Sequence, residues 1–141
     1  MPGMLSSFAS YEMKTSIIKV FAYDNKLMVG SLSNPFFPGE IYFQNLSQLL
    51  FIIDSLQNEL DYPQKSMETR TFDRDKTDTF DFTKTPAPAS TAVRATFALK
   101  LLFRQNASWQ GTIAWIEEKR ETAFRSALEM IMLMDSVLES L

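Results

Sequence analysis

The hydrophobic pattern near the start of the chain is that of a small β-sheet. Residues 15–23, TSIIKVFAY, are rich in β-branched and aromatic side chains, and residues 24–26 are types that tolerate tight turns. The strand pattern resumes over residues 27–32, so we predict a β-hairpin. Prolines and a glycine then interrupt the pattern over residues 34–39, and residues 40–43 form a short third strand.

From Asn45 the hydrophobic period changes to that of a helix. Apolar residues then recur at steps of three and four, as expected for one helix face: Leu46, Leu49, Leu50, Ile53, Leu56 and Leu60. Asn45 is a helix-capping residue type, and Gln48 can bond back toward the cap. Pro63 disfavours helix at the preceding residue, so the helix should end near Asp61.

The last third of the chain repeats this plan more clearly. Apolar residues alternate along residues 96–104, which predicts a strand packed on one side: Phe97, Leu99, Leu101 and Phe103 share a face. Residues 105–110 turn the chain, and residues 111–117 return it. The charged segment EEKRE leads toward a helix that Ser126 caps, with Glu129 completing the capping box.

The two helical segments match without a gap when Phe43 is placed against Phe124. FQNLSQLLFIIDSL then faces FRSALEMIMLMDSVL, and Asp54-Ser55 meets Asp135-Ser136. Capping explains some of the matches, because any helix start favours it, and two amphipathic helices can also coincide by chance. The Asp-Ser match is not required by helix physics, so we predict a duplicated ββ(β)α unit.

The predicted fold class is α+β: two ββ(β)α units form antiparallel sheet, with two helices packed on one face. Residues 13–61 and 95–141 are the two units of one domain, and residues 62–94 are a flexible polar linker. Residues 1–12 are an N-terminal extension, with Met13 as a possible start. Three phenylalanines stand out in the linker: Phe72, Phe80 and Phe82. They could dock on the body of the protein or on a partner, and an edge strand over TDTFDFT is the alternative.

Composition removes most kinds of catalysis. The 141 residues include no cysteine and no histidine, which excludes disulfides, thiolate nucleophiles and His-ligated zinc. The acids Glu117, Glu118 and Glu121 are interleaved with bases, as on a solvated surface. We therefore expect no enzyme, cofactor or metal site. With no signal peptide and no apolar run long enough to span a bilayer, a cytoplasmic location without membrane contact is expected.

We expect a non-enzymatic protein that binds another protein and associates with itself to form a homodimer. The candidate binding residues cluster at one connection: Arg104, Gln105, Asn106, Trp109 and Gln110. Alternatively, Trp109 folds back over the sheet and the polar residues only satisfy a turn. Apolar residues outside the main helix faces could pack helix against helix, or form the candidate oligomer interface: Leu128, Met132, Leu133, Phe51 and Ile52.

Two nucleotide-binding alternatives arise from the same region. Single-stranded nucleic acid could stack on three aromatic residues framed by cations: Phe103, Trp109 and Trp115, with Lys19, Lys100 and Arg104. The repeated layout is also similar to that of PUR-repeat and Whirly-type proteins, which bind single strands. A net charge of −3 and a pI near 5 do not favour this alternative, although a local basic patch could exist on an acidic protein.

The second alternative is cyclic di-GMP. RTFDR from Arg70 to Arg74, followed by NASWQG from Asn106 to Gly111, resembles the arginine and (D/N)xSxxG motifs of PilZ domains. The resemblance implies that the two arginines would grip the dinucleotide. However, a PilZ barrel has several strands after its second motif, where this chain predicts a strand and a long helix.

The strings FRQNASWQG and FRSALEMIMLMDS resemble a group of short Firmicutes proteins with an FRQNxxWQG segment followed by an FRSxxEL helix and LMD. The resemblance is good over roughly the last 45 residues, looser over the N-terminal half and slight over the linker. It implies a bacterial cytoplasmic origin and no particular activity.

Overall fold

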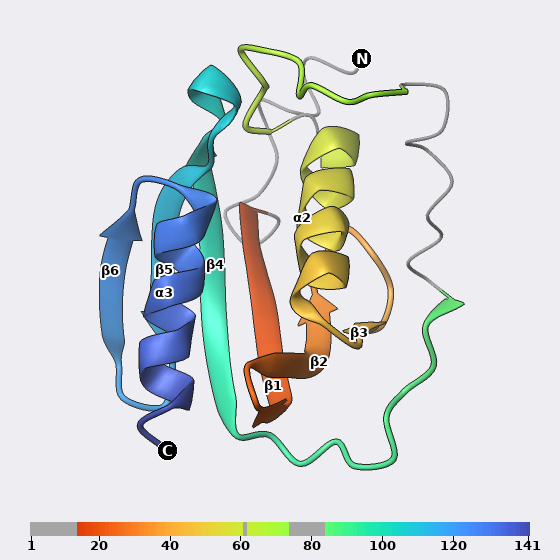
Figure 1. Ribbon diagram of the computed structural model, residues 1–141, viewed down its shortest axis with the longest axis vertical. Helices are drawn as coiled ribbons and strands as arrows, with labels where there is room; N and C mark the ends of the chain where they lie inside the picture. Colours follow the sequence, from red (N-terminus) through yellow and green to blue (C-terminus); the bar gives the residue numbers. More distant parts are fainter. Residues whose placement is uncertain (1–13, 61, 74–83) are drawn as a thin grey trace.

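The chain folds around one antiparallel sheet of six strands. The computed structural model describes residues 14–60, 62–73 and 84–141. The strands follow the order β3-β2-β1-β4-β5-β6, so the first strand of each half lies at the centre (Figure 1). Their bounds are β1 Thr15–Asp24, β2 Leu27–Ser33, β3 Ile41–Phe43, β4 Ala95–Phe103, β5 Gln110–Trp115 and β6 Arg120–Phe124.

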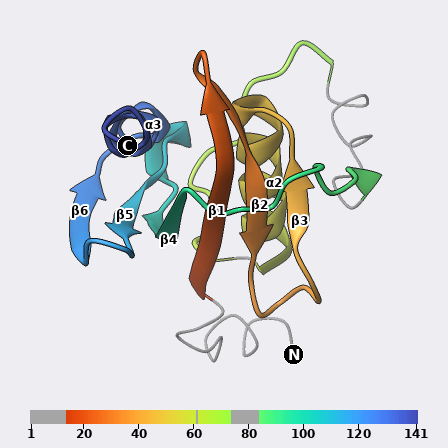
Figure 2. The same cartoon turned by 90° about the horizontal axis from the view of Figure 1, so that it is seen from below.

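Two helices lie on one face of this sheet. Helix α2 (Leu46–Leu60) packs on β2 and β3, and α3 (Ala127–Leu138) packs on β5 and β6. Figure 1 shows both in front of the sheet, and Figure 2 shows the twist of the sheet beneath them. The fold is therefore α+β with both helices in one layer, as the hydrophobic pattern predicted.

Both helices begin at the residues that the sequence indicated. The backbone N–H of Gln48 donates to Asn45 Oδ1 at 2.9 Å, and that of Glu129 donates to Ser126 Oγ at 3.1 Å. The side chains of Gln48 and Glu129 in turn accept from the backbone of Gln44 and Arg125, one residue before each cap. At each helix start, two backbone N–H groups thus donate to side-chain acceptors.

The core lies between the sheet and the helix layer. Alternate residues of the central strands point into it, because side chains on a strand alternate between faces. They meet the inner faces of both helices in one continuous cluster, whose largest fully buried members include Phe43, Phe97, Ile18, Leu49, Leu56, Leu99 and Met130. The two halves of the chain thus share a single core, which makes one domain.

Three details of the sequence prediction are wrong. Residues 120–124 form the edge strand β6, where we had expected the charged segment to lead into the helix. Ile52 is completely buried at 0% exposure, so it cannot belong to a surface interface. Phe103 is half exposed, because an irregularity in the β4–β5 pairing between Leu101 and Phe103 takes it off the buried face.

The two halves have the same order of elements: three strands and then a helix. In each half a glycine pairs across the sheet with a phenylalanine that precedes the helix: Gly30 with Phe43, and Gly111 with Phe124. Gly111 lies 81 residues after Gly30, and Phe124 lies 81 residues after Phe43. These are positional matches, and the duplication itself stays a prediction.

The described ends of the segment predicted as a linker contact the sheet and α2. Pro63 is buried, Lys65 forms a parallel bridge with Arg104, and the N–H of Arg94 donates to Val20 O at 2.8 Å. Phe72 is fully exposed.

Other sequence predictions fall outside the described residues: the extension 1–12, Met13, Asp61, Arg74, Phe80, Phe82 and the edge strand over TDTFDFT. None of the helices described is long and apolar enough to cross a membrane.

Candidate functional site

A groove runs between the two helices. Its volume is about 650 Å³, within the range typical of ligand sites. Three parts of the chain build most of it: the first half of α2, the connection after β4 and the start of α3. The lining residues are Ser47, Leu50, Phe51, Asp54, Thr69, Ala107, Ser108, Trp109, Ser126, Ala127 and Leu128.

The groove is apolar and nearly free of net charge. Phe51, Trp109 and Leu128 provide large apolar surfaces, while serine and threonine hydroxyls supply the polar groups. Among the described lining residues, Asp54 is the one that can ionise, and its Oδ1 lies 3.4 Å from Lys65 Nζ and 3.8 Å from Arg104 Nη1. Because this carboxylate is already paired, the groove favours uncharged apolar groups.

Arg104 does not point outward from the connection after β4. Its side chain is 3% exposed and crosses to α2 and to the segment after it. The guanidinium donates to the carbonyl of Pro63, to Asn58 Oδ1 at 2.6 Å and to the carbonyl of Gln57 at 3.4 Å. Arg104 therefore fastens the end of α2 to the sheet and does not contribute to a surface binding site.

The other residues of the predicted binding connection separate. Gln105 is exposed in a short 3-10 helix, η4 (Gln105–Ala107), and Gln110 is half-buried at the start of β5. Trp109 packs against the core and also lines the groove. Trp109 thus folds back onto the core, as the alternative prediction had it, yet part of its side chain remains accessible in the groove. The side chain of Asn106 lies outside the described part.

Three members of the predicted oligomer interface are strongly exposed. Phe51 on α2 is 62% exposed, and Leu128 and Met132 on α3 are 66% and 59% exposed. Leu128 and Met132 are four residues apart, so they form one stripe along α3. Phe51 and Leu128 also face the groove. Leu133 is half-buried at the other side of α3, and Ile52 is in the core.

Most acids of the helix layer have a base of the same chain beside them. Arg125 Nη2 lies 2.6 Å from Glu129 Oε2, and the hydrogen bonds from Arg125 lower the pKa of Glu129 to about 2. Lys26 Nζ lies 2.7 Å from Asp135 Oδ1. The hydrogen bonds that Asp135 accepts from Lys26 and then Tyr23 lower the pKa of its carboxyl. The helix layer therefore presents apolar residues among compensated charges.

The residues proposed for nucleic-acid stacking do not form one platform. Trp109 and Trp115 pack against the core on the helix side of the sheet. Lys100 alternates with the buried Leu99 and Leu101 along β4, so it faces the opposite side. Of the cyclic di-GMP motif, Arg70 is exposed in the segment after α2, and Arg74 lies outside the described residues.

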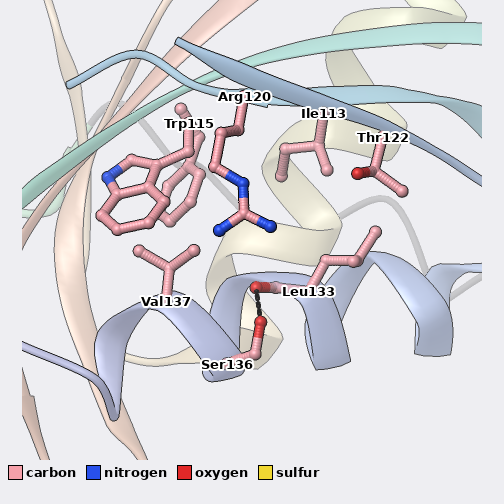
Figure 3. Close-up of a pocket in the computed structure, with 8 residues that line it drawn as sticks. Ile113, Trp115, Arg120, Thr122, Leu133, Ser136 and Val137 are labelled. Carbon is pink, nitrogen blue, oxygen red and sulfur yellow. Dashed lines mark hydrogen bonds between the residues drawn. The ribbon is translucent and has the colours of Figure 1, made fainter. Parts of the chain in front are cut away.

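A second, smaller cavity lies beneath α3, between the helix and strands β5 and β6. Its volume is about 80 Å³, and Figure 3 shows the side chains that surround it. Arg120, Thr122 and Ser136 form its polar part, and none of the three was predicted from the sequence as a binding residue. Charged and hydroxyl residues on an edge strand and an outer helix face look like ordinary surface, so no sequence signal could have found them.

Among the residues that the structure describes, no three acidic side chains gather as a metal site would require. No family model matches this chain, and neither the curated proteins nor the solved structures contain a match to it. The site therefore has to be interpreted from its own geometry.

Proposed function

We propose that this chain is a non-enzymatic binding protein that acts through protein–protein interaction, and that its partner is a second copy of itself. The observation that supports the proposal is the set of exposed apolar side chains Phe51, Leu128 and Met132, which lie on both helices beside an apolar groove. Large apolar residues gathered on one surface are typical of protein interfaces.

Charge makes a second copy a suitable occupant. Two identical acidic surfaces would repel one another if their charges were uncompensated. Here Asp54, Glu129 and Asp135 are each held by a lysine or arginine of the same chain, so two helix layers can approach without a large electrostatic cost. A twofold contact would place the same apolar residues of both copies together.

Light scattering after size exclusion tests the proposal at micromolar concentration. The expected mass is twice the 16.2 kDa of one chain. A single species of one chain's mass would contradict self-association. In parallel, fluorescence anisotropy with single-stranded DNA and RNA oligonucleotides should show no salt-dependent binding. Binding that weakens steeply with salt would instead support the nucleic-acid alternative.

A further inference from the structure

The cavity beneath α3 exists because the second half of the chain lacks a cover that the first half has. In the first half, residues 34–40 connect β2 to β3 and bring Phe36 and Phe37 against the core, with their rings 5.2 Å apart. The corresponding connection between β5 and β6 is only the tight turn of residues 116–119. Among the described residues, no aromatic pair fills the space on this side.

The burial of the two helices reflects this difference. Ile52 and Leu56 of α2 are completely buried. Leu133 and Val137, which take the same places in α3, are only partly buried and border the cavity. The apolar floor comes from the sheet, where Phe97 and Ile113 are buried beneath. The cavity thus combines an apolar floor with an open side.

Arg120 supplies a positive charge at this open side. Figure 3 shows its guanidinium pointing toward α3, with Trp115 on one side and Leu133 on the other. The guanidinium of Arg120 makes no hydrogen bond or ion pair within the described part of the chain, while its backbone pairs with Trp115. The Thr122 hydroxyl lies on the same strand. Ser136 Oγ donates to Leu133 O at 2.7 Å, so the lone pairs of the Ser136 oxygen remain free. The charge of Arg120 is therefore available to a ligand.

We propose that this cavity binds a carboxylate that carries a short aliphatic chain. An unpaired guanidinium recognises a carboxylate through two parallel hydrogen bonds, and the Thr122 hydroxyl can donate a further one. The volume of about 80 Å³ is smaller than the roughly 150 Å³ of a cavity that holds benzene, so the apolar part has to be small and branched, like a valine or leucine side chain. Such a group comes either from a free short-chain acid or from the C-terminal residue of a protein.

Heteronuclear NMR on the full chain tests this site. The indole N–H signal of Trp115, which lines the cavity, is the probe, and that of Trp109, which lines the groove, is the reference. Titration with 3-methylbutanoate should shift the Trp115 signal saturably and leave the Trp109 signal in place. The uncharged amide of the same acid should bind more weakly by about tenfold or more. Short peptides ending in valine, with a free or an amidated terminus, then distinguish a protein C-terminus from a free acid as the source.

Arg120→Gln is the decisive variant, because this exposed side chain can be changed without disturbing the core. It should weaken carboxylate binding by about tenfold or more. Lys119→Gln, which removes the same charge one residue earlier in the exposed turn, should leave binding unchanged. The proposal is overturned if no saturable shift occurs, if the amide binds as well as the acid, or if both variants behave alike.

Discussion

The phenol of Tyr23 in β1 donates a hydrogen bond of 2.6 Å to Oδ1 of Asp135 in α3, 112 residues later in the chain. The other half has a similar contact in reverse, since Arg104 after β4 reaches Asp54 in α2. Each aspartate is thus held by a residue from the other half. This gives a structural role to the Asp-Ser match that helix physics alone does not require.

The Tyr23–Asp135 contact predicts a loss of stability at high pH. Burial and then the hydrogen bond to Asp135 raise the pKa of Tyr23 to about 12. A raised native pKa means that the stabilisation is complete below the ordinary value of 10 and is lost as pH rises from 10 toward 12. We expect Tyr23→Phe to lower the free energy of unfolding by roughly 1 kcal/mol at neutral pH, and wild type to lose this advantage as pH rises through the window.

Urea unfolding across the pH range measures this effect. At the acid end the sign is opposite, because the lowered pKa of Asp135 gives stability that is lost as pH falls through its native value. Tyr62→Phe is the control, since it keeps the ring over which Lys14 lies. A Tyr23→Phe deficit that stayed constant from neutral to strongly alkaline pH would rule out the proposed link.

Arg104→Ala should be strongly destabilising although it removes a charged residue. The guanidinium is buried and satisfies the carbonyls of Gln57 and Pro63 and the side chain of Asn58. Because its loss leaves buried acceptors unpaired, we expect a cost of about 3 kcal/mol in the free energy of unfolding.

Arg125→Ala provides the comparison for Arg104→Ala. Arg125 is exposed and pairs with Glu129 across the start of α3, so its removal should cost much less than that of Arg104. Chemical denaturation of both variants measures the difference. Equal stability losses would show that Arg104 is an ordinary surface residue and would reopen its role in binding.

The two central-sheet glycines should not tolerate a side chain. A Cβ at Gly30 would lie 2.1 Å from Lys19 O, and one at Gly111 would lie 1.9 Å from Lys100 O, both far inside van der Waals contact. Since the contacting atoms are backbone, the strands would have to separate. Gly30→Ala or Gly111→Ala should each cost more than about 3 kcal/mol or prevent folding.

Gly39→Ala separates this crowding from backbone strain. Gly39 has a φ of +77° but no atom within 4 Å of an added Cβ, so its substitution should cost only about 1 kcal/mol. Thermal unfolding followed by circular dichroism ranks the three variants. A Gly39→Ala loss as large as that of Gly30→Ala would mean that close strand contact is not the reason.

The strands of the first half and both helix starts could be predicted because their signals are local. The Thr15–Asp24 strand is dense in β-branched residues, and Asn45 and Ser126 each bond to a residue three positions later. Strand β6 could not be predicted in the same way. It is an edge strand in which only Phe124 is buried, so it shows no alternation of apolar residues.

The candidate site was harder to predict, because it depends on contacts between distant segments. Arg104 looked available in a polar turn, but its partners lie more than 40 residues earlier, around Gln57 and Pro63. Ile52 lies within an uninterrupted apolar run, LLFII, in which periodicity alone does not fix the centre of the buried face. We correctly expected Phe51, Leu128 and Met132 to be exposed, because one sheet covers only one face of each helix.

The most direct test of the central claim is a comparison of two matched variants in solution. Leu128→Glu places a charge within the exposed apolar surface of α3. Leu27→Glu places the same charge on an equally exposed leucine, 61% accessible, at the tip of the β1–β2 hairpin. By light scattering at micromolar concentration, Leu128→Glu should have the mass of one chain, while wild type and Leu27→Glu should have the mass of two. A Leu128→Glu protein that remained a dimer would contradict the proposed role of the helix layer.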